Sequence, residues 1–112
     1  MSRISLRVRR LVMDRDEEQC AHCGTNVGLT LQHRINRQAG GSKLRDTASN
    51  LLTLCWESNL RLEADSAFAD LGRRMGWKLR SWEDPKEVPV RYADGNKYTL
   101  TDRFTRLIVQ ED

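Results

Sequence analysis

The chain lacks the long apolar run that a membrane-spanning helix needs, and its N-terminus lacks the apolar core of a secretory signal. It also lacks internal repeats, low-complexity stretches and any linker long enough to separate domains. We therefore expect one soluble domain over residues 1–112, located in the cytoplasm and without a membrane partner.

Cysteine is scarce and odd in number, since the chain contains three. An odd count argues against a closed disulfide framework, and in a reducing compartment it favours metal ligation. Cys20 and Cys23 form a Cys-x-x-Cys pair that Gly24 closes, and Cys55 follows far along the chain. A domain of this size often gains stability from a bound metal, so we expect the three cysteines to belong to one metal site.

Acidic residues are missing from two segments of a chain whose net charge is only +3. Two basic patches beside a metal site suit a phosphate backbone, although an ordinary solvated surface explains either patch taken alone. The cations are Arg3, Arg7, Arg9 and Arg10 within residues 1–13, and Arg34, Arg37, Lys43 and Arg45 within residues 33–45.

The hydrophobic periodicity predicts an α+β fold in which a first helix capped by Ser5 and a long helix ended by Gly76 are the clearest elements. Trp77, Trp82 and Tyr92 are expected to pack in the core rather than to stack on bases. The expected elements are helices at 6–17, 48–54 and 57–75, strands at 27–33 and 77–82, a loop at 36–46, and a hairpin of 88–92 with 97–101 around Asp94-Gly95, with the last ten residues frayed.

Five short motifs follow one another in order: Cys20-Ala-His-Cys23-Gly24, Leu31-Gln32-His33-Arg34, Gly40-Gly41, Asn50-Leu-Leu-Thr-Leu-Cys55 and Asn59. Over about residues 8–62 the chain resembles an HNH endonuclease of the His-Me finger class, and its tail is similar to the tails of HNH proteins of actinobacterial phages. The resemblance implies an α+β fold: a small ββα-metal (HNH) finger with a zinc-knuckle-like loop, an N-terminal helix and a C-terminal β-hairpin tail. The core would span about 8–76 and the extension 77–112.

The resemblance also implies a function: a metal-dependent DNA endonuclease that hydrolyses phosphodiester bonds, encoded by a phage or prophage and active in the bacterial cytoplasm. By analogy, a phage terminase is a further possible partner. The alternative is a catalytically degenerate module of the same fold that binds nucleic acid or assists DNA packaging. A zinc-ribbon protein that binds only protein is a third interpretation.

His33 is the expected general base, because only histidine has an unperturbed pKa near neutrality, and the matching family residue activates the attacking water. Gln32 stands where the family often has a metal-binding aspartate, and Asn59 matches the last letter of the motif. Both would hold the catalytic Mg²⁺ or Mn²⁺, although neutral ligands bind such ions less firmly than carboxylates. Asn50 matches the middle letter, which either ties the loop near His33 or caps a helix.

Cys20, Cys23 and Cys55 match three of the four structural zinc ligands of the family, and Ser58 stands at the fourth place. Serine is a poor zinc ligand, so three outcomes stay open. Zinc is completed by water, His22 or Glu57; the site is empty; or packing has replaced it. In a second alignment, this chain has lost an insert that carries the last histidine of the motif in some phage relatives. Asn59 is then only a neighbour of the site.

Six cations are expected to contact DNA. Arg34 and Arg37 lie just past the base and could polarise the scissile phosphate, with salt bridges to Asp46 or Glu57 as the alternative. The full set is Arg34, Arg37, Lys43, Arg45, Arg9 and Arg10.

Overall fold

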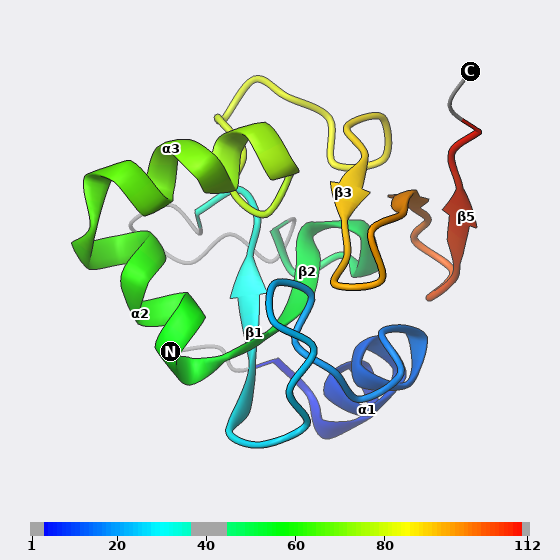
Figure 1. The fold of residues 1–112 in the computed structure, drawn as a ribbon. Coiled ribbons are helices and arrows are strands. Elements are labelled where there is room, and N and C mark those ends of the chain that lie inside the picture. The colour runs from blue at the N-terminus through cyan, green and yellow to red at the C-terminus, as the bar shows by residue number, and fades with distance from the viewer. Residues whose placement is uncertain (1–3, 37–44, 111–112) are drawn as a thin grey trace.

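A computed structural model describes residues 4–36 and 45–110 (Figure 1). In this part of the chain, three α-helices and two small antiparallel sheets make up an α+β fold, as the sequence predicted. None of these helices is long and apolar enough to cross a membrane. The elements are α1 (Leu6–Arg15), β1 (Leu29–His33), the 3-10 turn η2 (Ala48–Asn50), β2 (Leu51–Cys55), α2 (Trp56–Ala64), α3 (Ser66–Met75), β3 (Val90–Arg91), β4 (Lys97–Leu100) and β5 (Arg106–Ile108).

The antiparallel hairpin of β1 and β2 lies at the centre of the molecule. In Figure 1, α2 and α3 lie to its left, and β3 and β5 lie to its right. The register pairs Gln32 with Leu52 and His33 with Leu51. Because α2 begins directly after β2, the chain has a strand–strand–helix order, and β1 and β2 both contact α2.

Each face of the hairpin is covered by apolar side chains. Leu51 packs with Val12 of α1, and the opposite face, which carries Leu52, packs on the larger core cluster. That cluster joins the helices to the C-terminal sheet, because it contains Phe68 and Trp77 as well as the following residues of the C-terminal region: Val90, Tyr92 and Leu100. The residues after 76 therefore share a core with β2 and the helices α2 and α3.

Asp16 connects three parts of the fold through one buried carboxylate. The Arg15 guanidinium donates two hydrogen bonds to it, at 2.8 and 2.9 Å. The Thr53 backbone N–H of β2 donates at 3.0 Å, and the Tyr92 hydroxyl donates at 2.6 Å. A buried charge is tolerated only when it is paired and hydrogen-bonded in this way.

The local stop signals are confirmed. Ser5 caps α1, with its hydroxyl accepting a hydrogen bond from the Val8 N–H. Gly76 ends α3 at a φ of +80°, and a side chain there would collide with the carbonyl oxygen of Pro89. The hairpin around Asp94-Gly95 also forms, between β3 and β4.

Two predicted helices are wrong. Residues 48–54 form one 3-10 turn and then strand β2, because the backbone of 51–55 pairs with β1, a partner far away in sequence. The predicted helix at 57–75 is two helices that meet at Asp65. The Asp65 carboxylate accepts from the Phe68 N–H and so caps α3, while its own N–H bonds to Arg61 of α2.

The tail also departs from the prediction. Residues 77–82 form no strand; Leu79 makes a single bridge to Ile35 instead. Residues 106–108, within the segment predicted to fray, form β5 of the C-terminal sheet; residues 111 and 112 of that segment lie outside the described residues. Trp77 and Tyr92 are buried as expected, but Trp82 is 77% exposed, so its predicted core position is wrong.

Candidate metal centre and catalytic site

Three cysteine sulfurs meet where the Cys-x-x-Cys loop lies against the start of α2. The Sγ atoms of Cys20, Cys23 and Cys55 lie within 4.8 Å of one another, and Cys23 Sγ is 3.9 Å from Cys55 Sγ. Zn²⁺ bonds thiolates at about 2.3 Å, which places the sulfurs of a tetrahedral site roughly 3.8 Å apart. The three cysteines could therefore hold a metal ion such as zinc.

Backbone contacts fix the loop that carries the first two cysteines. The Gly24 N–H donates to the Cys20 carbonyl at 2.8 Å, and Gly24 takes a φ of +78°, which glycine adopts without steric cost. The Ala21 N–H donates to the Thr53 carbonyl at 2.9 Å and so ties the loop to β2. Cys55 ends β2, so the hairpin positions all three sulfurs.

The Ser58 side chain lies where a fourth ligand would stand. Its Oγ is 3.2 Å from Cys55 Sγ and 3.8 Å from Cys20 Sγ. His22 Nδ1 lies 2.9 Å from the same oxygen, whereas Glu57 is exposed to solvent. His22, and not Glu57, therefore lies beside the position of the fourth ligand.

The surroundings affect the pKa of each ligand differently. Burial raises the pKa of Cys55, but its hydrogen bonds with the Ser58 hydroxyl and the Ser58 N–H outweigh burial, and the pKa falls below its ordinary value. Burial raises the pKa of Cys23. Burial, aided by the charge of Arg61, lowers the pKa of His22, which favours the neutral imidazole that can bind a metal.

Replacing Ser58 with cysteine is expected to tighten zinc binding by on the order of 10²-fold. Structural zinc sites contribute roughly 10–16 kcal/mol, or about 3 kcal/mol for each of four ligands. A thiolate at position 58 would add the contribution of one ligand, because Ser58 Oγ already lies near the sulfurs of Cys20 and Cys55. Competition with a chromophoric chelator measures the dissociation constant.

Ser66→Cys provides the matched control, because Ser66 is exposed on α3 and adds a thiol away from the cluster. It should leave the zinc dissociation constant unchanged. Equal zinc affinity in Ser58→Cys and the unmodified chain would contradict the placement of the fourth ligand at this corner.

His33 ends β1 and forms a pair with Asp46. Its Nε2 lies 2.7 Å from Asp46 Oδ1, and the His33 side chain is 20% exposed. When the ring is neutral and donates its Nε2–H to this carboxylate oxygen, Nδ1 has a free lone pair. The pair can therefore accept a proton at Nδ1 while Asp46 orients the ring.

Asn50 ties together the two ends of the segment that follows His33. Its Oδ1 accepts from the Ile35 N–H at 2.8 Å, and its Nδ2 donates to the carbonyls of Ile35 at 3.1 Å and Arg45 at 2.8 Å. Asn50 therefore holds the two ends of the loop after His33 together, which is the first of the two roles considered for it. Asn50 ends η2, and β2 rather than a helix follows it.

Gln32 and Asn59 come from two elements that contact each other, β1 and α2. Gln32 is buried, and its Nε2 has no hydrogen-bond partner. Asn59 is half-buried. Within residues 4–36 and 45–110, no hydrogen bond joins either side chain to His33, and strand alternation places Gln32 and His33 on opposite faces of β1.

Comparison of the chain with protein families, curated proteins and solved structures gives no match.

Arg34 does not lie where a residue that contacts phosphate must lie. It is fully buried, and its guanidinium donates four hydrogen bonds to backbone carbonyls. Burial lowers its pKa to about 10. It pairs with neither Asp46 nor Glu57, and its acceptors are the carbonyls of Ser49, Gly76, Pro85 and Val88 at 2.7–2.9 Å.

The remaining predicted DNA contacts are spread over the molecule. Arg9 and Arg10 lie on α1 beside two acidic residues, Asp14 and Glu18, around one hollow. Arg45 is half-buried. The other two, Arg37 and Lys43, lie outside the described residues.

Two residues of interest were missed from the sequence. Asp46 was considered only as an ion-pair partner of Arg34 or Arg37, although it is the first carboxylate after the basic segment that follows His33. The place of Asp46 directly after that basic segment is the sequence signal that points to it. Trp82 was assigned to the core, and its exposure has no signal in the local pattern.

Proposed function

We propose that the chain is a metal-dependent endonuclease that hydrolyses phosphodiester bonds of DNA, with His33 as the general base. The His33–Asp46 pair is the observation that supports this proposal most directly. It stands at the end of the first strand of a strand–strand–helix unit. A cluster of three cysteines stabilises the start of the helix in this proposal when it holds zinc.

The reaction requires one proton acceptor near the phosphate. Asp46 holds the His33 ring with Nε2–H toward the carboxylate, and Nδ1 accepts a proton from the attacking water. The water oxygen bonds to phosphorus as the P–O3′ bond breaks in line with it. The leaving 3′-oxygen takes a proton from solvent, and His33 later releases its own proton to solvent.

Gln32 and Asn59 are the residues that would hold the catalytic cation. The Gln32 amide is buried with an unpartnered Nε2, and a half-turn of the amide would place Oε1 there as an oxygen ligand, but Gln32 projects from the face of β1 opposite to His33. Mg²⁺ or Mn²⁺ would stabilise the negative charge on the leaving oxygen. Both protein ligands are neutral, so phosphate oxygens must complete the shell, and we expect the ion to bind with DNA rather than before it.

A plasmid-nicking titration tests the proposal. The purified chain should nick supercoiled DNA in millimolar Mg²⁺ or Mn²⁺ and stop when a chelator is added. A folded protein that is inert with every divalent metal would contradict it. If that protein still bound DNA with a steep salt dependence, the non-catalytic alternative would stand in its place.

Replacing Asp46 with asparagine is expected to slow nicking by about 10²- to 10⁴-fold. The amide can donate to Nε2, which moves the ring hydrogen to Nδ1 and removes the base. Initial rates of supercoiled-plasmid loss measure the effect. Asp14→Asn removes the same charge from an exposed position on α1 and should leave the rate unchanged; equal slowing in both variants would indicate a general charge effect.

A further inference from the structure

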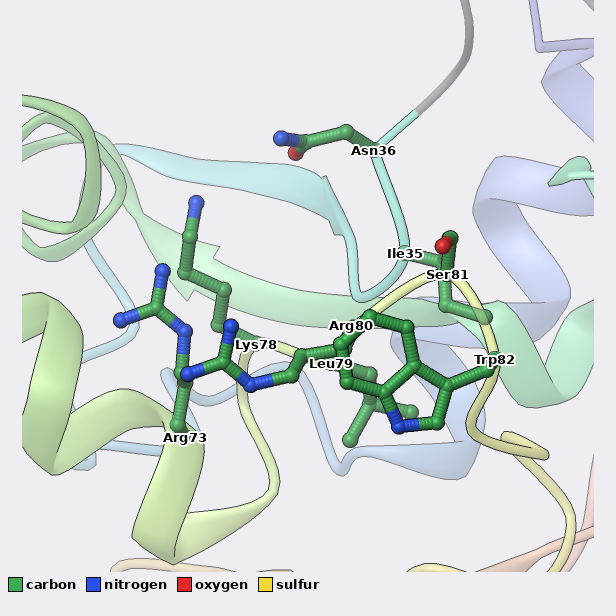
Figure 2. A pocket seen from close by; sticks show the side chains of 8 residues that line it. All are labelled: Ile35, Asn36, Arg73, Lys78, Leu79, Arg80, Ser81 and Trp82. Atoms are coloured by element: carbon green, nitrogen blue, oxygen red, sulfur yellow. The ribbon is translucent and has the colours of Figure 1, made fainter.

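A cationic hollow lies beside the segment that follows β1, away from the cysteine cluster. It encloses about 250 Å³ and is lined by the end of α3 and by the segments around residues 36 and 80. Figure 2 shows the charged ends of Arg73, Lys78 and Arg80 gathered to the left of the Trp82 ring, with Asn36 above them. Enclosed small-molecule sites are usually larger, at roughly 300–1,000 Å³.

Two cations of the hollow have acidic partners. Arg73 lies 3.1 Å from Asp70, and Lys78 lies 4.0 Å from Glu63. The two carboxylate side chains are 69% and 57% exposed, and those of Arg73 and Lys78 are 34% and 12% exposed. Ion pairs with exposed carboxylates are weak, so a phosphate that reaches the two cations can replace them. The Arg80 guanidinium stands 5.7 Å from the centre of the Trp82 ring.

Trp82 presents an apolar face to solvent next to these charges. Trp77, five positions earlier, is buried in the core, whereas Trp82 is 77% exposed. An exposed indole beside a row of cations is the combination that single-stranded nucleic acid uses, since the ring stacks on a base and the cations follow the backbone. In a duplex the faces of the bases are already stacked on one another.

We propose that this hollow binds an unpaired stretch of nucleic acid, with a base stacked on Trp82 and phosphates on Arg73, Lys78 and Arg80. The proposal deepens the proposed nuclease function and rests on it for the role of the bound strand. Asn36 follows His33 by three residues, so their Cα atoms lie within about 11 Å. A strand held in the hollow can thus continue to the catalytic pair.

The test measures binding without cleavage. Fluorescence anisotropy follows labelled single-stranded and duplex oligonucleotides, in deoxy and ribo form, with the full chain in a chelator. The chain should prefer single strands, and Trp82→Ala should weaken that binding by about 5- to 150-fold. Trp56→Ala is the matched control, because Trp56 is also exposed, at 63%, but lies outside the hollow.

Arg80→Gln gives a second, independent readout. It should lower the slope of log affinity against log salt by about 0.7, the value for one phosphate contact on a single strand. Lys86→Gln removes an exposed cation outside the hollow and should leave the slope unchanged. The deoxy and ribo arms decide which sugar the hollow accepts.

Equal affinity in Trp82→Ala and the unmodified chain would overturn the proposal, as would equal losses in the two tryptophan variants or no binding of any oligonucleotide. Because no metal is present, a chain that binds through Trp82 but never nicks DNA would disprove only the proposed nuclease activity. If the chain nicks DNA but neither Trp82→Ala nor Arg80→Gln changes oligonucleotide binding, only the proposed role of the hollow is disproved.

Discussion

Replacing His33 with alanine is expected to abolish DNA nicking, with a loss of at least about 10²- to 10⁴-fold in rate. In the proposed mechanism, the substitution removes the imidazole whose Nδ1 would accept the proton of the attacking water. His33 is the last residue of β1, and the bond to Asp46 is the hydrogen bond that its ring makes in the described structure. The fold should therefore remain, and initial nicking rates measure the chemical effect.

Two measurements separate a catalytic role of His33 from a structural one. Urea denaturation of His33→Ala should show a free energy of unfolding within about 1 kcal/mol of the unmodified chain, the size of one hydrogen bond. Added imidazole should restore part of the nicking rate, because it supplies the missing base. Full activity in His33→Ala would end the proposed mechanism.

Replacing Arg34 with alanine is expected to destabilise the protein strongly. The guanidinium donates hydrogen bonds to four backbone carbonyls, of which those of Gly76 and Ser49 are buried and those of Pro85 and Val88 are partly buried. Its loss leaves the buried acceptors without a donor. Breaking a buried charged network costs about 3–5 kcal/mol, out of a total stability of roughly 5–15 kcal/mol. Urea denaturation followed by circular dichroism measures the change.

Two further variants define the cause of that loss. Arg34→Met fills much of the volume without donors, so it should be almost as unstable as Arg34→Ala if hydrogen bonding dominates. Arg74→Ala removes an exposed arginine from α3 and should change the free energy of unfolding by less than about 0.5 kcal/mol. Stability in Arg34→Ala equal to that of the control would show that the four bonds contribute little.

Features set by a few neighbouring residues could be predicted from the sequence. The Ser5 cap, the Gly76 stop and the turn at Asp94-Gly95 each depend on local backbone preferences, and all three form. The approach of the three cysteines followed from their spacing and chemistry. These signals act over short distances or require specific residue types.

Features set by distant partners could not be predicted. Residues 51–55 have a pattern that fits either a helix or a buried strand, and pairing with β1 decides it. The sequence around Arg34 is typical of a surface cation. In the fold its side chain is buried, and its hydrogen-bond acceptors are carbonyls up to 54 positions away. Asp46 reaches His33 across 13 positions. Only the folded chain shows which polar residues are enclosed and which are free to act.

The carboxylate of Asp16 has a consequence for how the protein is made. During synthesis, Asp16 leaves the ribosome before Tyr92, whose hydroxyl completes its shell from 76 positions later in the chain. Until that residue emerges, the charge cannot be buried at low cost, so α1 cannot dock permanently on the hairpin. Permanent docking of α1 thus awaits synthesis of the segment that carries Tyr92.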